Sequence, residues 1–193
     1  FVFQTVILFL TFYYTDVVGL NPVTVGSIFL LVRLIDAVTD PLMGSLADKT
    51  RTRWGAYRPY LLWMALPFAL ISVIAFTTPD TDYNGKLIYA IASYVLLMLM
   101  YTAINIPYSA LGGVITASPL ERVSVQSYRF VFAMLGGLIV SLCTLPMVNW
   151  YGAGNDARGY QLTMLTMGLV GMVLFLLCFA GTRERVLPAD GPP

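Results

Sequence analysis

The residues with the clearest capacity for chemistry are three charged side chains inside one apolar run, residues 23–46: Arg33, Asp36 and Asp40. Their spacing of i, i+3 and i+7 places all three on one face of an α-helix. A charge at the centre of a bilayer costs about 2.5–3.5 kcal/mol on insertion scales, so this face must look into protein or water rather than lipid. The cluster is therefore a candidate functional site.

The charge balance of the cluster predicts a cation site. Arg33 can neutralise one carboxylate, which leaves a charge of about −1 for one monovalent cation or one proton. Thr39 is next round the helix, and carboxylate and hydroxyl oxygens suit hard cations rather than soft metals. The competing interpretation is an ion pair of Arg33 with Asp36 or Asp40 that only joins helices. Two acids facing one base favour the cation site.

Two further groups of polar residues lie within apolar runs. Thr102 and Asn105 are three residues apart in the run 87–114 and are followed by Pro107, which bends a helix and frees a carbonyl group. Tyr128 and Arg129 lie near the start of the next run. Arg129 has two interpretations, as a buried substrate ligand or as a side chain that extends to the membrane interface.

The composition places most of the protein surface in lipid. Hydrophobic residues make up 58% of the chain and charged residues 11%, whereas soluble domains carry about 25% charged residues. The net charge of +1 provides no basic field for nucleic acid. The chain has no His, and Cys143 and Cys178 lie in apolar runs as expected of inert packing residues. A membrane-embedded enzyme would need a nucleophile–base pair or a metal cluster, so we expect neither catalysis nor a cofactor.

Six apolar runs are long and continuous, as transmembrane helices require, rather than short and alternating like barrel strands. They cover residues 1–14, 23–46, 60–76, 87–114, 125–148 and 162–180. We therefore predict an all-α membrane protein of six transmembrane helices, the first of them truncated. Aromatic residues near the ends of the runs, Tyr13, Tyr14, Trp63 and Trp150, are expected at the membrane interface.

The cations between the runs predict the orientation. One set of connectors holds seven of them: Lys49, Arg51, Arg53, Arg58, Arg122, Arg183 and Arg185. The other set holds Lys86 and Arg158. Positive residues stay on the cytoplasmic side, so we expect both ends of this multi-pass chain to be cytoplasmic. Residues 1–181 would form one bundle, and residues 182–193 would begin a cytoplasmic linker.

The segment DAVTDPLMGSLADKTRTRWGAYRP, residues 36–59, is the most specific motif. It resembles the signature of the glycoside–pentoside–hexuronide:cation symporters, the melibiose permease type, within the major facilitator superfamily. The segments FYYTDVVGL (12–20), YTAINIPYSALGGVIT (101–116), QSYRF (126–130) and TLPMVNWYGAGN (144–155) resemble that family in the same order. Since the family is roughly twice as long, the resemblance implies the N-terminal half of such a fold, a missing C-terminal half, and a bacterial inner membrane.

The resemblance also implies roles for individual residues of the cation site. Asp36 and Asp40 match the two acids of the family's site, and they would bind the metal ion if Na⁺ is the coupling ion. Thr39 and Thr102 match its further oxygen ligands. Arg33 would be the charge partner of the acids.

On the sugar side, Arg129 matches the sugar-contacting arginine of the family, which favours its interpretation as a ligand. Asn105 and Ser109 stand where the melibiose permease has a sugar-binding acid and an aromatic platform. Tyr128, beside Arg129, is a further candidate for substrate binding. These departures indicate a glucuronide or general glycoside rather than a galactoside.

The segment 44–53 also resembles the superfamily's loop between its second and third helices. The expected gating loop comprises Gly44, Asp48, Arg51, Arg53, Gly55 and Arg58. Gly44 would permit a close helix approach, and Asp48 would pair with a loop cation to latch the inner gate. The alternative is a basic loop that only sets topology, and both roles are compatible.

The expected function is secondary active symport of a sugar, glycoside or hexuronide with Na⁺ or H⁺. Two six-helix halves would rock around a site near the middle of the membrane. The expected partners are the sugar, membrane lipid and the C-terminal half. The alternative function is a non-transporting membrane scaffold or sensor derived from a half transporter.

Overall fold

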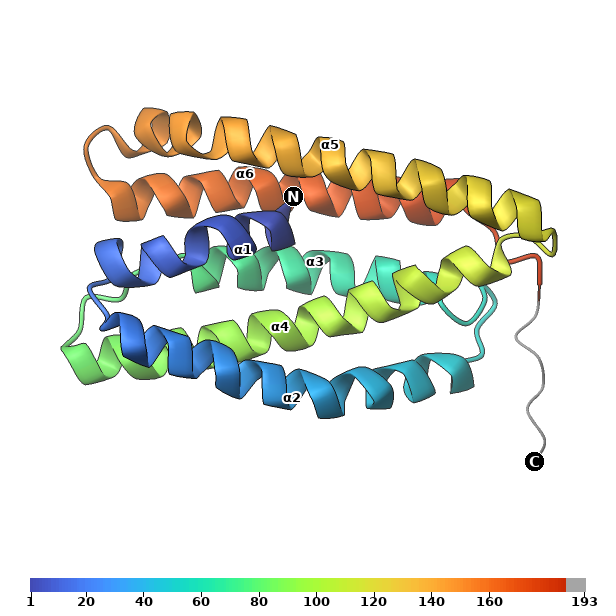
Figure 1. Cartoon of the computed structure of the whole chain (residues 1–193), viewed down its shortest axis with the longest axis horizontal. Helices are drawn as coiled ribbons and strands as arrows, with labels where there is room; N and C mark the ends of the chain where they lie inside the picture. Colours follow the sequence, from blue (N-terminus) through green and yellow to red (C-terminus); the bar gives the residue numbers. More distant parts are fainter. Residues whose placement is uncertain (187–193) are drawn as a thin grey trace.

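The computed structural model describes residues 1–186, which form a bundle of helices with no strand among these residues. The elements are α1 (Val2–Phe12), a π-helical continuation η1 (Tyr13–Val17), α2 (Pro22–Lys49), α3 (Arg58–Ala75), α4 (Tyr83–Val114), α5 (Pro119–Gly152) and α6 (Asp156–Gly181). All six run along the long axis of the bundle (Figure 1). Five are long and apolar enough to cross a membrane, and the segment Val2–Val17 is shorter. The all-α fold with a short first helix is confirmed.

Several helices begin earlier than their apolar runs, because polar capping residues extend them. Asn21 precedes Pro22 and accepts a hydrogen bond from the amide of Val23 at 2.9 Å. Ser118 precedes Pro119 and caps α5 in the same way. A capping side chain followed by proline is a favoured way to start a helix, since proline has no amide proton to leave unsatisfied.

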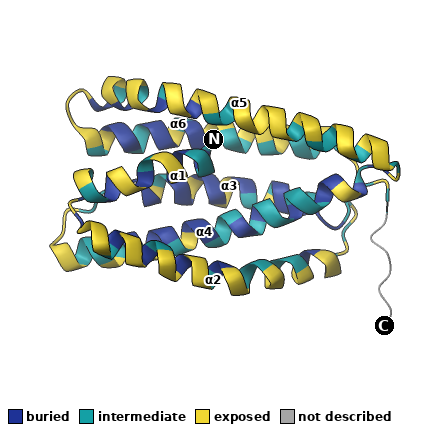
Figure 2. Cartoon of the chain, in the orientation of Figure 1, coloured by how far each residue is buried: buried dark blue, intermediate teal, exposed yellow. Residues whose placement is uncertain are grey.

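The buried core lies where α3 packs against α4 and α6, and α6 also packs on α5. Figure 2 shows more of α3 buried than of α2 and α5, which carry long exposed faces. These faces are rich in large apolar side chains such as Leu34, Leu42, Phe132 and Leu142. Such a surface suits lipid or another helical unit rather than water.

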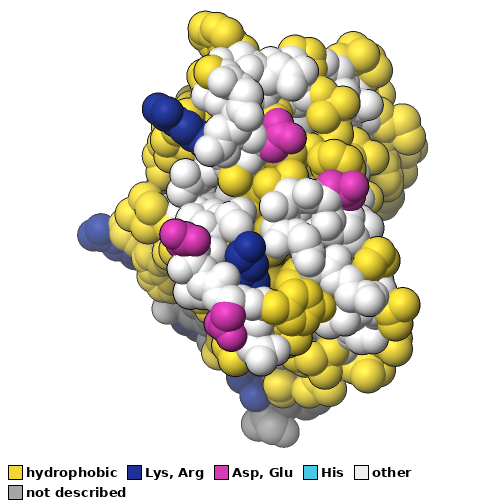
Figure 3. Space-filling view, turned by 90° about the vertical axis from the view of Figure 1, so that its left-hand side faces the viewer, with side chains coloured by type: hydrophobic (Ala, Val, Ile, Leu, Met, Phe, Trp, Pro, Cys, Tyr) yellow, Lys and Arg dark blue, Asp and Glu magenta, His cyan; other side chains and the backbone are white. Residues whose placement is uncertain are grey.

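The two sets of connectors lie at opposite ends of the bundle (Figure 1). We call the end formed by the α2–α3 loop, the α4–α5 loop and the last turn of α6 the basic end. The other end is viewed in Figure 3, where acidic side chains are prominent. Its loops and first helical turns hold Asp16, Asp80, Asp82 and Asp156. The grouping of cations at one end is as predicted, while the side of the membrane that it faces stays a prediction.

An aromatic cluster fixes the junction of α1 and η1. Tyr13 is 0% exposed and Tyr14 is 1% exposed, and the ring of Tyr13 lies 5.0 Å from Phe76 and 5.4 Å from Tyr160. The Tyr13 hydroxyl is hydrogen-bonded to the Thr78 hydroxyl at 2.8 Å. The prediction that Tyr13 and Tyr14 lie in an interfacial belt is therefore wrong, because they pack inside the bundle.

Candidate cation and sugar sites

The candidate cation site is built where α2 meets α4. The Thr102 hydroxyl of α4 donates a hydrogen bond to Oδ1 of Asp40 of α2 at 2.9 Å. Thr102 is 5% exposed, so this polar contact lies within the apolar contact between the two helices. The structure thus brings together two residues, 62 positions apart, that the sequence indicated as ligands of one ion.

One turn before Asp40, Asp36 is buried and forms an ion pair with Arg33. Nη1 of Arg33 lies 3.7 Å from Oδ2 of Asp36, and the side chain of Arg33 is 64% exposed. The sequence left open which aspartate pairs with Arg33, and the structure selects Asp36. The hydrogen-bond partner of Asp40 is the neutral hydroxyl of Thr102, whereas the partner of Asp36 is a cation.

Two oxygens beside this contact have no hydrogen-bond partner within the described part of the chain. They are Oδ1 of Asp36 and the hydroxyl of Thr39, both buried. A buried polar oxygen without a partner is costly. Together with the Asp40–Thr102 pair, these atoms form a group of hard oxygens on two helices with one uncompensated charge, which fits a Na⁺ ion or a proton.

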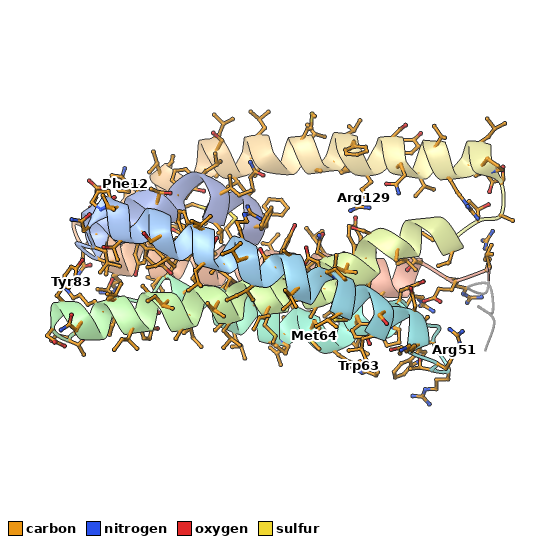
Figure 4. All side chains as sticks on the ribbon, turned by 60° about the horizontal axis from the view of Figure 1, so that its bottom comes forward. Phe12, Arg51, Trp63, Met64, Tyr83 and Arg129 are labelled. Atoms are coloured by element: carbon orange, nitrogen blue, oxygen red, sulfur yellow. The ribbon has the colours of Figure 1, made fainter. Side chains whose placement is uncertain are left out.

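The candidate sugar site lies nearer the basic end, between α4 and α5. Nη2 of Arg129 donates to the hydroxyl of Ser109 at 2.9 Å, and its guanidinium lies 4.6 Å from the centre of the Tyr108 ring. Figure 4 shows Arg129 in the space between α5 and the rest of the bundle. These inward contacts favour the interpretation of Arg129 as a substrate ligand, which stays a prediction.

One face of α4 connects the two sites. Thr102, Asn105 and Ser109 are spaced i, i+3 and i+7, and Asn105 is half-buried between the other two. Tyr128, by contrast, is 66% exposed and lies about 100° round α5 from Arg129. The structure does not bring Tyr128 to the Ser109–Arg129 pair, and its role in binding stays a prediction.

Two aromatic residues of the site were not singled out from the sequence. Tyr108 lies under Arg129, as described above. Tyr101 stacks on Phe3 of α1 with ring centres 4.0 Å apart. In the sequence, only its spacing could have pointed to Tyr101, because this residue lies one helical turn before Asn105 on α4.

The predicted gating loop is ordered by hydrogen bonds at the basic end. The hydroxyl of Tyr57 donates to Oδ1 of Asp48 at 2.7 Å, and Nη1 of Arg51 donates to the main-chain carbonyl of Asp48 at 3.1 Å. Burial and the hydrogen bond to Asp48 raise the pKa of Tyr57 to about 12, so the hydroxyl remains a donor at neutral pH. A latch between Asp48 and a loop cation stays a prediction.

The other two arginines of this loop make contacts with aromatic rings. The guanidinium of Arg53 lies 4.3 Å from the centre of the Trp54 ring. The guanidinium of Arg58 lies 4.7 Å from the centre of the Phe179 ring, and its Nη2 donates to the Phe179 carbonyl at 2.5 Å. Arg58 thus joins the start of α3 to the end of α6.

Within the described residues, the close helix approach expected at Gly44 is not seen between α2 and α4, and its role in the gating loop stays a prediction. A methyl group at this position would meet only Cγ2 of Ile106, at an ordinary contact distance of 3.9 Å. This part of the molecule therefore does not require glycine at position 44 for α2 to approach α4.

Over the described residues, the fold is an all-helical apolar bundle with five helices long enough to cross a membrane, and an acid of α2 meets a threonine of α4 inside it, as expected of a polytopic membrane protein with an internal polar site. Residues 2–191 match the family described as MFS/sugar transport protein, and the chain belongs to that family. Its relatives include the inner membrane symporter YicJ of Escherichia coli (strain K12), which is 46% identical over 192 residues, covering 100% of this chain and 41% of the relative.

Two further relatives carry names that indicate sugars. The putative glycoside/cation symporter YagG of the same organism is 50% identical over 185 residues, covering 96% of this chain and 40% of the relative. The isoprimeverose transporter of Lactiplantibacillus pentosus is 40% identical over 186 residues, covering 95% and 39%. The chain spans about two fifths of the length of these relatives. The family match, together with a relative that is named as a glycoside/cation symporter, confirms the resemblance of the sequence motifs.

Proposed function

We propose that this chain forms the N-terminal six-helix half of a symporter that carries a sugar, glycoside or hexuronide together with Na⁺ or H⁺. The observation that carries the proposal is the Asp40–Thr102 hydrogen bond across α2 and α4, with the unpartnered oxygens of Asp36 and Thr39 beside it. No covalent chemistry is needed, since alternating access rocks two halves around a central site. The basic end would face the cytoplasm.

The arrangement suggests how the ion and the sugar are coupled. A cation that replaces the Thr102 proton as a partner of Asp40 would bind ligands from both α2 and α4. Ser109 is seven residues further along α4 than Thr102, which is about 10 Å of helix. Fixing α4 against α2 therefore also fixes Ser109, to which Arg129 of α5 is hydrogen-bonded. Such coupling is reciprocal, so the sugar must tighten the cation by the same factor.

The charge of the site explains why a cation or a proton would have to bind before the carrier changes conformation. With Arg33 balancing Asp36, Asp40 leaves about one negative charge within an apolar region, which a cation or proton removes. Asn105 is an amide and does not titrate, so a coupled proton would have to reside on Asp36 or Asp40. Na⁺ and H⁺ are thus alternatives at one site.

Transport is tested with the complete transporter, this chain joined to its C-terminal half, in proteoliposomes. Labelled isoprimeverose and methyl glycosides are suitable first probes, because one relative is named for isoprimeverose. Counterflow together with uptake driven by a Na⁺ or pH gradient supports the proposal. Saturable sugar binding with neither counterflow nor uptake would instead identify a scaffold or sensor.

A further inference from the structure

The N-terminus of α3 is capped by a residue from the other end of the chain. The residue before the helix, Tyr57, makes no side-chain cap of its own. The carboxylate of Glu184 takes that place, accepting hydrogen bonds from the amides of Ala56 at 2.8 Å, Tyr57 at 2.8 Å and Arg58 at 2.9 Å. The first amides of a helix lack partners within it, and a carboxylate there also meets the positive end of the helix dipole.

Gly55 makes room for this carboxylate. Its φ is +113°, in the region that favours glycine, and a Cβ atom at this position would overlap the carboxylate of Glu184. Gly19 and Gly154 also have positive φ, +83° and +95°, but a Cβ atom there would meet nothing within 4 Å. Gly55 therefore differs from these glycines in its contact rather than in its backbone conformation.

The segment that carries Glu184 is attached to the ends of two other helices. The amides of Arg185 and Val186 both donate to the carbonyl of Val114, the last residue of α4, at 3.0 Å. On the other side, Arg58 donates to the carbonyl of Phe179 in the last turns of α6. Glu184 thus sits where the ends of α3, α4 and α6 meet.

Tyr57 extends this junction to α2. Its amide donates to Glu184 and its hydroxyl donates to Asp48, which lies in the last turn of α2. We propose that Glu184 is a positioning residue for transport: by holding the backbone of Tyr57, it places the hydroxyl that fixes Asp48. The ends of α2, α3, α4 and α6 then move as one unit when the two halves rock. This inference rests on the proposed transport function.

Loss of the carboxylate frees the loop before α3 but leaves the cation and sugar ligands in place. We therefore expect slower transport with unchanged binding. A cap that only stabilised α3 would leave the transport rate of the folded protein unchanged.

The first test is hydrogen exchange in the complete transporter. Glu184→Ala should speed exchange of the amides of residues 56–58 at least about ten-fold, because their acceptor is lost. Gly55→Ala should do the same by displacing the carboxylate, and Glu184→Ala should add nothing in that background. Gly154→Ala is the matched control, since it imposes the same backbone strain without the contact. Unchanged exchange at 56–58 in Glu184→Ala would overturn the proposal.

The second test is the rate of sugar counterflow, with sugar affinity measured on the same preparations. Glu184→Ala should slow counterflow roughly five-fold or more, the lower end of coupling between sites, with affinity within about two-fold of the unmodified protein. Tyr57→Phe keeps the amide but removes the hydroxyl, so it should slow counterflow in the same direction.

Combining Glu184→Ala with Tyr57→Phe should be no slower than Glu184→Ala alone. Multiplied effects, or a normal rate in Glu184→Ala with fast exchange at 56–58, would show a cap without a positioning role. Glu184→Gln keeps the shape and one acceptor, so its counterflow rate should lie between those of the unmodified protein and Glu184→Ala. This variant replaces Glu184→Ala in the test if the alanine variant fails to fold. Absence of transport by the unmodified protein would refute the proposed function and leave the exchange results interpretable.

Discussion

The contact between α2 and α4 differs from the contact between α5 and α6 in what holds the helices together. At α5–α6, a Cβ atom at Gly159 would overlap the backbone carbonyl of Val148, and one at Gly152 would lie 3.2 Å from Cα of Gly159. At α2–α4, no glycine is required by space, and a hydrogen bond between Asp40 and Thr102 joins the helices. Backbone packing is indifferent to ions, whereas a carboxylate–hydroxyl contact changes when a cation binds. The comparison indicates that α2–α4 is the contact that an ion can control.

The strongest test of this comparison is Asp40→Asn. The amide keeps the shape and can still accept from Thr102, but it removes the uncompensated charge. Gradient-driven sugar accumulation should fall about 100-fold, which corresponds to roughly 2.7 kcal/mol, while exchange without a gradient survives in part. The measurement is uptake into proteoliposomes under a Na⁺ or pH gradient.

Asp82→Asn is the matched control for that experiment, because Asp82 is an exposed N-cap of α4 and asparagine caps helices as well as aspartate. It should accumulate sugar normally. Asp36→Asn is the second variant tested in the same uptake assay. Concentration of sugar against a gradient by both Asp36→Asn and Asp40→Asn would refute the coupling mechanism.

Arg129→Ala separates the sugar site from the ion-controlled contact. Removal of the guanidinium should weaken sugar binding by about 10- to 100-fold, as expected for hydrogen bonds made by a charged group. Cation affinity should stay within about two-fold, because Arg129 contacts Ser109 and Tyr108 rather than α2. Calorimetric titration of each ligand measures both values. Arg158→Ala, an exposed cation at the opposite end of the bundle, should alter neither; a matching loss in that variant would rule out a specific role for Arg129.

Thr102→Val is a smaller change at the contact itself. It preserves the volume but removes the hydrogen bond to Asp40, so cation affinity should fall about five-fold, equivalent to roughly 1 kcal/mol. Thr102→Ser restores the hydroxyl and should restore the affinity. Equal cation affinities for the valine and serine variants would mean that the hydroxyl is not a ligand.

The sequence could predict the helical fold and the inward-facing acids of α2 for one physical reason, whereas Thr102 of α4 was indicated only by the resemblance to the symporter family. Charges in apolar runs are costly, so Asp36 and Asp40 had to face the interior, and helical periodicity then placed them. Periodicity could not place groups on separate helices relative to each other. The Tyr101–Phe3 stack and the Glu184 cap depend on contacts over 98 and more than 120 positions. The burial of Tyr13 and Tyr14 was missed because a tyrosine near the end of an apolar run suits either the interface or the interior.

The smallest expected effect is on stability, and it tests the packing half of the comparison. Gly44→Ala should change the free energy of unfolding by no more than about 1 kcal/mol, in the stabilising direction, because alanine favours the helix and its methyl group meets only Ile106 at 3.9 Å. Gly159→Ala must push α5 away from α6 at the Val148 carbonyl, which should cost about 1–3 kcal/mol. Thermal unfolding of the two variants in the same detergent compares them directly. If Gly44→Ala is the more damaging of the two, then α2 and α4 approach more closely than described, and the Asp40–Thr102 bond is a consequence of packing rather than the element that joins the helices. If Gly159→Ala alone unfolds early and Gly44→Ala accumulates sugar normally, α2 is held by its polar contact and remains free to respond to the ion.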